Sequence, residues 1–553
     1  MSNGSKKNSF LVQGSILAVA SIVSRIIGLV YRVAVTNILG DIGNDYYSCA
    51  FSIYSIMLTI SSYSLPLAVS KLVSARMARG QKRNAARILK GALIFSLISG
   101  AIVALVCFFG ADFITTNIMN TPMSAIALRV LAPTLLIVAI MGVLRGYFQG
   151  LGSMIPTATS QIIEQIVNAC GSIVFAITFS QYGLEIGQAM SDPENYMAAY
   201  GAAGSTLGTS VGALAGLVFL LIILFAYRPV LKRGIRRDKT DRRDIESYSN
   251  IYRVILLTTI PVLLSTTVYR LSEFLDQSIY KKMMAFMSKE AIEASINWGI
   301  YAGRVTVLIA IPTTIADSIA VSVIPSLTAA LSEDNHQLIR EKIISAIRFV
   351  MVISFPCAVG MGVLASPILQ LLYHDTRALP AQLIIISAIS IVFYTLSTLT
   401  TGILQGIDKM LSPVINAFVA LVIHVIVIIG AMLLFDLNIY AVVISNIVFP
   451  FVVSLMNTFA IKKHIRYRAN IRKTYVVPAI SSIVMGLVVW TVYKFLMFVF
   501  YINALATLVS IIIGVVVYFI VLLALKGLSE DELLNLPKGH ILLGVAKSLG
   551  FYK

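Results

Sequence analysis

The chain has 553 residues, of which 58% are hydrophobic and only 12% are charged. Soluble proteins carry about 25% charged residues, and the mean hydropathy here is +0.88. This composition therefore excludes a soluble globular protein and indicates a membrane protein with most of its mass in the bilayer. The four cysteines have no metal-ligand spacing and read as small packed thiols: Cys49, Cys107, Cys170 and Cys357.

Apolar runs long enough to cross a bilayer recur along the whole chain. Because these runs are continuous and do not alternate in polarity, they predict helices rather than strands. The sequence thus predicts an all-α polytopic membrane protein with fourteen transmembrane helices, at 10–39, 46–72, 91–114, 125–148, 156–182, 200–227, 251–280, 298–330, 345–373, 381–406, 411–435, 438–461, 476–500 and 503–526.

Basic residues gather in the loops that follow the second, sixth and twelfth expected helices, at 76–90, 228–243 and 462–473. The loops after the first, third, fifth and eleventh contain no Lys or Arg. The positive-inside rule therefore predicts that both termini are cytoplasmic. Lys281, Lys282 and Lys289, after the seventh helix, are the main exception. Most of the net charge of +18 is a topology signal, so we expect no nucleic-acid partner.

An internal repeat divides the chain. Gly-Tyr-Phe-Gln-Gly-Leu-Gly-Ser-Met at 146–154 aligns with Gly-Ile-Leu-Gln-Gly-Ile-Asp-Lys-Met at 402–410, an offset of 256 residues. The repeat predicts two pseudo-symmetric six-helix lobes of the same orientation, at 1–230 and 231–470, followed by two C-terminal helices and a cytoplasmic tail at 471–553. Two like bundles around a central site are a common design of secondary transporters.

Arg25 and Arg32 lie inside the first expected helix, seven residues apart. On a helix they share one face, about 10 Å apart along the axis. A charge at that depth costs roughly 3 kcal/mol or more unless it faces water or a partner, and this helix offers no carboxylate. The shared face is therefore expected to look into a cavity. Arg32, nearer the end of the run, has snorkelling to the interface as its alternative.

Other charges also fall inside expected helices. Glu164 and Asp317 are deep, and each is either a counter-ion to an arginine or an ion-coupling site. Arg304 lies a few residues into the eighth helix, with no carboxylate in the neighbouring turns. Arg270 and Glu273 are three residues apart on one helix, which also allows a simple pair.

This pattern of arginines favours an anionic ligand. The planar guanidinium binds phosphate oxygens bidentately and stays charged, which suits a pyrophosphate. The sequence contains no phosphate-cradling glycine motif, metal triad or nucleophile elbow, so we expect a transporter rather than an enzyme, with no catalytic residue, resident metal or cofactor. A coupling ion remains an open alternative.

Several segments resemble one known family. They are Ser-Arg-Ile-Ile-Gly at 24–28, Pro-Leu-Ala-Val-Ser-Lys at 66–71, Arg-Gly-Tyr-Phe-Gln-Gly at 145–150, Ser-Gln-Ile-Ile-Glu-Gln at 160–165 and Ile-Pro-Ser-Leu at 324–327. Nearly the whole chain resembles the MurJ branch of the multidrug/oligosaccharidyl-lipid/polysaccharide exporter superfamily, in the Gram-positive variant that includes stage V sporulation protein B-like polysaccharide exporters.

The resemblance implies a function and a set of site residues. The family flips lipid II, the undecaprenyl-pyrophosphate-linked peptidoglycan precursor, to the outer leaflet, using two lobes around a cationic cavity. Its substrate-binding residues fall on Arg25, Asp45 and Arg304, and a further arginine falls within one residue of Arg32. The helix-2 arginine of Gram-negative members has no match, and Lys71 is the nearest cation. Lys71, Glu164, Arg270 and Asp317 are expected as secondary or ion-coupling residues.

The expected protein is therefore a multi-pass flippase of the bacterial plasma membrane that works by alternating access and is driven by the membrane potential. A flippase for another polyprenyl-linked polysaccharide repeat unit would share nearly every feature. A cation or drug antiporter of the same superfamily would have twelve helices and a cavity dominated by carboxylates. The expected partners are the bilayer and a lipid-linked anionic glycan, with the chain a monomer beside cell-wall synthesis proteins.

Overall fold

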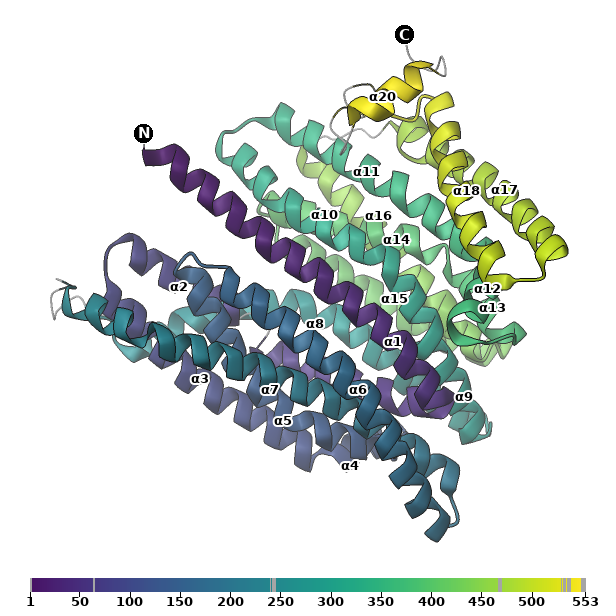
Figure 1. Ribbon diagram of the computed structural model, residues 1–553, viewed down its shortest axis with the longest axis horizontal. Helices are drawn as coiled ribbons and strands as arrows, with labels where there is room; N and C mark the ends of the chain where they lie inside the picture. Colours follow the sequence, from purple (N-terminus) through teal and green to yellow (C-terminus); the bar gives the residue numbers. More distant parts are fainter. Residues whose placement is uncertain are drawn as a thin grey trace. The chain divides into compact units, whose positions relative to one another are not determined.

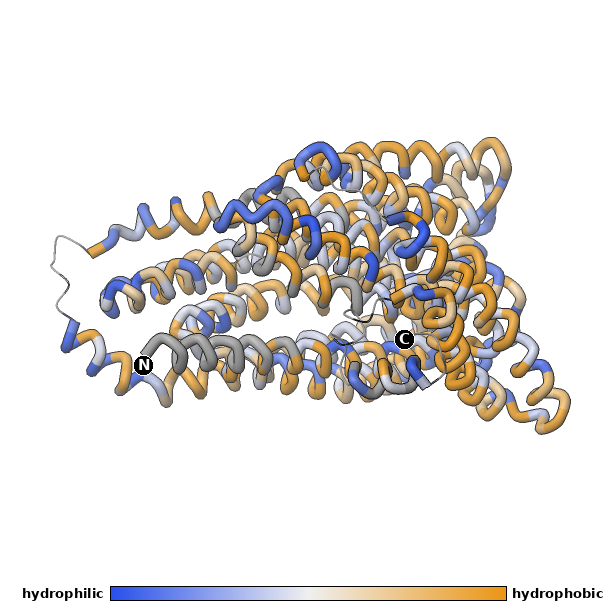
Figure 2. The backbone as a smooth tube through the Cα atoms, turned by 90° about the horizontal axis from the view of Figure 1, so that it is seen from above, coloured by the Kyte–Doolittle hydropathy of each residue, from blue (hydrophilic) through white to orange (hydrophobic). Residues whose placement is uncertain are grey.

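The computed structural model describes residues 2–62, 65–238, 240, 245–465, 470–528, 530, 534 and 539–548. These residues form helices and connecting turns, with no β-strand among them, which confirms the predicted all-α class (Figure 1). Hydrophobic residues dominate the helices along their length (Figure 2). The chain divides into two compact units, Met1–Gly303 and Arg304–Lys553.

The first unit is built around α1, which contains most of the first two predicted spans. The helix bends at Gly40, whose φ of 64° and ψ of −172° are readily adopted only by glycine. The helices are α1 (Ser2–Ser62), α2 (Leu65–Ala78), α3 (Lys82–Phe109), α4 (Ala111–Phe113), α5 (Ser124–Gly150), α6 (Ile155–Ala189), α7 (Pro193–Arg236), α8 (Tyr248–Phe286) and α9 (Ala291–Ile300). One π-helical turn, η1 (Ile114–Ile118), follows α4, and a second, η3 (Tyr301–Val305), follows α9.

Close packing of α7 on α6 fixes the position of α6. Glycines recur at every fourth position of α7, from Gly204 to Gly216, and present a face without side chains. A Cβ on Gly208 would lie 2.1 Å from the Ser172 nitrogen, so only glycine allows this approach. With one side of α6 held against α7, a different side meets α1.

The second unit contains α10 (Thr306–Ser332), α11 (His336–Val363), α12 (Ala365–Tyr373), α13 (Ala378–Ser387), α14 (Ser390–Gly406), α15 (Leu411–Phe435), α16 (Ile439–Ile465), the π-helical turn η4 (Arg472–Val476), α17 (Val477–Phe500), α18 (Asn503–Ala524) and α20 (Gly539–Ser548). The two helices that follow the repeat, α17 and α18, share an apolar core with α11. The Tyr518 hydroxyl of α18 donates a 2.6 Å hydrogen bond to the Val352 carbonyl of α11.

Glycines of the repeated segment make equivalent contacts in the two units. A Cβ on Gly150 of α5 would lie 2.7 Å from the Val73 Cβ of α2. A Cβ on Gly406 of α14 would lie 3.1 Å from the Leu327 Cβ of α10. Each repeat thus packs its glycine-bearing helix closely against the corresponding helix of its own unit.

The count of membrane spans differs from the sequence prediction. The described residues of each predicted apolar run are mainly helical, but the described part of the chain has 11 helices long and apolar enough to cross a membrane. The number is up to 12 if α13 and α14, bent by 41°, form one span. Two predicted spans merge into Val19–Ala78, and α8 is not among the candidates found in the described residues. The predicted count of fourteen is therefore not confirmed.

Candidate functional site

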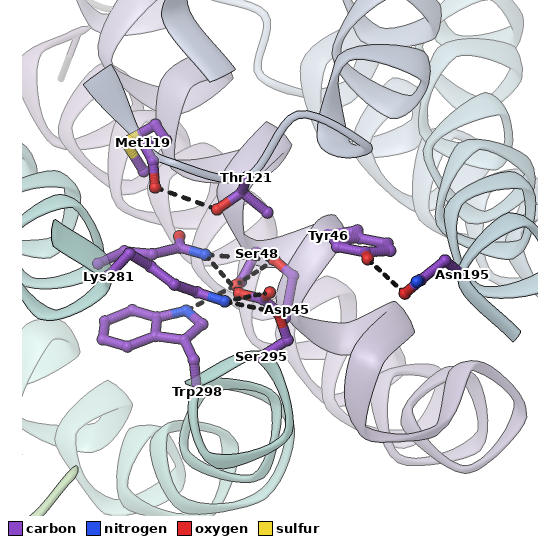
Figure 3. Close-up of polar contacts among 10 residues, drawn as sticks. Asp45, Tyr46, Ser48, Met119, Thr121, Asn195, Lys281, Ser295 and Trp298 are labelled. Atoms are coloured by element: carbon purple, nitrogen blue, oxygen red, sulfur yellow. Dashed lines mark hydrogen bonds and ion pairs between the residues drawn. The ribbon is translucent and has the colours of Figure 1, made fainter. Parts of the chain in front are cut away.

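Two deeply buried charges of the first unit meet just after the bend in α1. Asp45 is 0% exposed and Lys281 of α8 is 3% exposed, and their Oδ2 and Nζ atoms are 2.7 Å apart. The Gln277 amide donates to the other Asp45 oxygen at 2.8 Å, and the Lys281 ammonium donates to the Ser295 hydroxyl at 2.7 Å. Figure 3 shows this polar cluster, which joins α1 to α8 and α9.

Two neighbouring contacts hold the same helices together. The Trp298 indole of α9 donates to the Ser48 hydroxyl at 2.9 Å (Figure 3). The Asn44 amide donates to the carbonyls of Thr36 at 2.9 Å and Gly40 at 2.6 Å, which satisfies backbone groups at the bend. Both Asp45 oxygens are engaged by protein side chains. Asp45, predicted as a substrate-binding residue, thus forms a bridge between helices in this conformation.

The two helix-1 arginines differ in their surroundings. Arg32 is half-buried, and its guanidinium carbon lies 4.0 Å from the centre of the Tyr47 ring, a cation–π contact. Its Nη1 is buried and has no hydrogen-bond partner among the described residues. Arg25 is exposed, although it lies inside an apolar helix. The first helix therefore presents a half-buried arginine with one unsatisfied donor and an exposed arginine.

The side of α6 next to α1 is polar. The Asn168 amide donates to the Tyr31 hydroxyl at 3.1 Å, and the Ser21 hydroxyl donates to the Gln161 carbonyl oxygen at 3.4 Å. On the same helix, the Glu164 carboxylate accepts a 2.7 Å bond from Arg145 of α5. Of the two roles that sequence left open for Glu164, its geometry here is that of a counter-ion.

Arg304 begins the second unit and is also neutralised. Its Nε lies 3.0 Å from the Asp375 carboxylate, which binds Arg377 as well, at 2.7 Å. Burial alone would raise the pKa of Asp375, but hydrogen bonds from Arg377 and the charges of both arginines outweigh burial and hold this pKa below its ordinary value. Arg304 is therefore paired with a carboxylate from the loop between α12 and α13.

The secondary residues do not form one cluster in what the structure describes. Lys71 is exposed on α2. Arg270 and Glu273 form the expected pair on α8, at 3.5 Å and largely exposed. Asp317 falls within α10, but its side chain lies outside the described residues.

Sequence reasoning missed the partners Gln277, Ser295, Arg145 and Asp375. Lys281 did carry a signal, because it interrupts the pattern of the positive-inside rule. A lysine on the side that should lack positive charge needs a reason, and its bond to Asp45 supplies one.

Comparisons with known proteins agree with this architecture. The family model described as "Polysaccharide biosynthesis protein" matches residues 10–331, and the model described as "Lipid II flippase MurJ" matches residues 194–510. Stage V sporulation protein B of Bacillus subtilis (strain 168) is 24% identical over 531 residues, which cover 96% of this chain and 98% of that protein. Lipid II flippase MurJ of the same organism is 25% identical over 498 residues, 87% of this chain and 88% of that protein.

Solved structures share the fold. An inward-facing multidrug resistance MATE family transporter of the MOP superfamily matches with a TM-score of 0.65 at 16% identity, over 80% of this chain and 94% of that one. The inward closed conformation of lipid II flippase MurJ matches with a TM-score of 0.62 at 17% identity, over 91% of this chain and 97% of that one. Because each family model covers more than half of the sequence, this multi-pass membrane chain belongs to the MurJ lipid II flippase family and to the polysaccharide biosynthesis protein family.

Proposed function

We propose that the protein flips a polyprenyl-pyrophosphate-linked glycan from the cytoplasmic to the outer leaflet of a bacterial plasma membrane, and that this cargo is lipid II. The family membership and the similarity to a lipid II flippase along most of the chain support this function. Flipping such a lipid requires a polar path for its head group and a means of closing that path on one side.

The observation that carries the proposal is the state of Arg32. A guanidinium stacked on Tyr47, with Nη1 buried and without a partner among the described residues, holds an unused charge-assisted donor inside a membrane span. Leaving such a donor unsatisfied costs about 1–3 kcal/mol or more. A pyrophosphate oxygen would satisfy it, and Arg25, about two helical turns away, would supply a second cation.

The Asp45 cluster supports alternating access. It ties α1 to α8 and α9 through a buried ion pair and three further hydrogen bonds. By the predicted topology this end of the helices faces outside. We propose that the cluster closes the outer end of the path and that it separates when the head group is released.

The test is complementation in cells depleted of their own lipid II flippase. Arg32→Ala and Arg25→Ala should each fail to support growth at normal membrane levels, because the head group loses a cation. Each Arg→Lys variant should rescue only in part, since an ammonium cannot reproduce the bidentate fork. Arg129→Ala is the matched control, because Arg129 is an exposed arginine paired with Asp112 and should be dispensable. Full complementation by Arg32→Ala would reject the proposal.

A flippase for another polyprenyl-linked glycan is the second candidate. The match of residues 10–331 to the broader polysaccharide biosynthesis family favours it, as does the near full-length similarity to stage V sporulation protein B. Both candidates use the pyrophosphate in the same way. Failure of the wild-type chain to replace a lipid II flippase, with rescue of a different lipid-linked glycan exporter, would select this second function.

A further inference from the structure

The polar face of α6 carries glutamine side chains beside the arginines of α1. Gln161 accepts a hydrogen bond from Ser21, and the Gln165 carbonyl oxygen lies 3.8 Å from the position of a Cβ on Gly28. The two glutamines are four residues apart and therefore share one face of α6. On α1, Ser21, Arg25 and Gly28 are spaced by four and three residues, so Arg25 lies on the face that meets these glutamines.

This face is expected to be wet. Arg25 is exposed within an apolar helix, and an exposed charge at membrane depth is tolerated only where it meets water or polar groups. Gln161 and Gln165 are each half-buried next to it. They therefore border the same polar path rather than lipid.

The neighbouring polar groups of α6 are satisfied, but Gln165 is not. Asn168 bonds Tyr31 and accepts from Ser172, and Glu164 is paired with Arg145. Gln165 makes no hydrogen bond with any described residue. On a wet face, a half-buried amide with no protein partner keeps its two donors and its acceptor oxygen available. Gln165 can therefore bind a polar ligand that enters this path.

We propose, on the basis of the function above, that Gln161 and Gln165 bind the uncharged sugar portion of the head group while the α1 arginines hold the pyrophosphate. A primary amide offers two donors and one acceptor oxygen, which matches hydroxyl and acetamido groups. A bare pyrophosphate offers only acceptor oxygens, so it leaves the acceptor oxygen of each amide without a partner, whereas a sugar satisfies both the donors and the acceptor. The glutamines thus favour a glycosylated cargo over the bare carrier lipid.

The test compares two probes bound to the purified full chain in lipid nanodiscs: lipid II and undecaprenyl pyrophosphate without sugar. Gln165→Met and Gln161→Met keep the side-chain length and remove the amide. Each should weaken lipid II binding about tenfold, the factor for one lost hydrogen bond of typical strength, and leave binding of the bare carrier unchanged. Gln181→Met changes an exposed glutamine of the same helix and should affect neither probe.

A second readout separates a ligand-binding role from a structural one. Without ligand, Gln165→Met should leave the melting temperature unchanged or raise it, because the native amide has no described partner. A lowered melting temperature, unchanged lipid II affinity, or equal losses for both probes would overturn the sugar-binding role. Arg32→Ala should weaken both probes. A wild-type protein that binds neither probe would overturn the proposed function itself, and this inference with it.

Discussion

Asp45 and Lys281 place a carboxylate and an ammonium together where water is excluded, at 0% and 3% exposure. Such a pair brings little net stability, because desolvation offsets the attraction. Removing either partner is nevertheless costly, because the remaining buried charge then has no opposite charge beside it. The pair therefore suits a contact that must be either fully formed or fully separated.

This dependence gives a prediction for stability. Asp45→Ala leaves the Lys281 ammonium buried with only Ser295 beside it, and should lower the free energy of unfolding by roughly 3–5 kcal/mol. Adding Lys281→Met to Asp45→Ala should recover a large part of this loss. Unfolding measured in detergent micelles checks both variants. Breaking the exposed Arg270–Glu273 pair with Glu273→Ala is the control and should cost less than about 1 kcal/mol. The coupling would be contradicted if the double variant lost as much free energy of unfolding as Asp45→Ala and Lys281→Met lose when their separate losses are added.

Residue-level sequence reasoning identified charges better than partners. Arg25, Arg32, Glu164 and Arg304 stand out from their apolar surroundings, and Asp45 was indicated by the family resemblance. Their partners come from other helices: Asp45 pairs with a lysine 236 positions away. Spacing along one helix reveals pairs such as Arg270 and Glu273, but a pair between helices depends on packing that spacing does not contain.

At the level of elements, α1 contacts η3 before its bend and α9 after it. The Thr36 hydroxyl donates to the Gly303 carbonyl at 3.2 Å, and a Cβ on Gly303 would lie 3.1 Å from the Thr36 methyl carbon. Gly303 has room for this contact because it lacks a side chain. A crosslink between Thr36 and Gly303 can therefore show whether α1 and η3 are in contact.

A cysteine pair at these positions tests the closed arrangement. In a background without the four native cysteines, Thr36→Cys with Gly303→Cys should form a disulfide under oxidation. A sulfur at the Thr36 methyl position would lie 3.1 Å from the Cβ of residue 303, which allows the bond to close. The crosslinked protein should lose flipping, and reductant should restore it, since the helices must separate for the path to open. Each single variant is the control for the substitution itself. Full crosslinking with wild-type flipping would argue against movement here.

The sequence predicts the helices well and their boundaries less well. The run at 411–435 coincides with α15, because apolar length alone defines a span. The break expected between 39 and 46 is instead a bend at Gly40 within one continuous helix. Loop composition indicates a turn there, whereas a single glycine conformation lets the helix continue.

At the level of the whole chain, repeat and packing divide the molecule differently. The repeat predicts lobes at 1–230 and 231–470, and those boundaries stay a prediction. The division of the chain into compact units instead falls between Gly303 and Arg304. The Asp45 cluster explains the difference, because it holds α8 and α9 to α1. The sequence repeat shows which segment was duplicated, whereas the contacts show which helices pack together in one conformation.

The final prediction concerns the energy source. The basic loops at 76–90, 228–243 and 462–473 predict which side is cytoplasmic, and the proposed cargo carries about two negative charges on its pyrophosphate. An inside-negative potential drives an anion outward by roughly 2.3 kcal/mol per charge per 100 mV. Two charges then gain about 4.6 kcal/mol, a bias of more than a thousandfold. In this account the arginines only lower the barrier across the midplane, and the potential sets the direction.

Collapsing the potential with an ionophore, at fixed pH and sodium, should therefore reduce the appearance of lipid II in the outer leaflet. Flipping that continues unchanged would exclude the potential as the driving force and leave ion coupling, at a carboxylate such as Asp317, as the source to be tested.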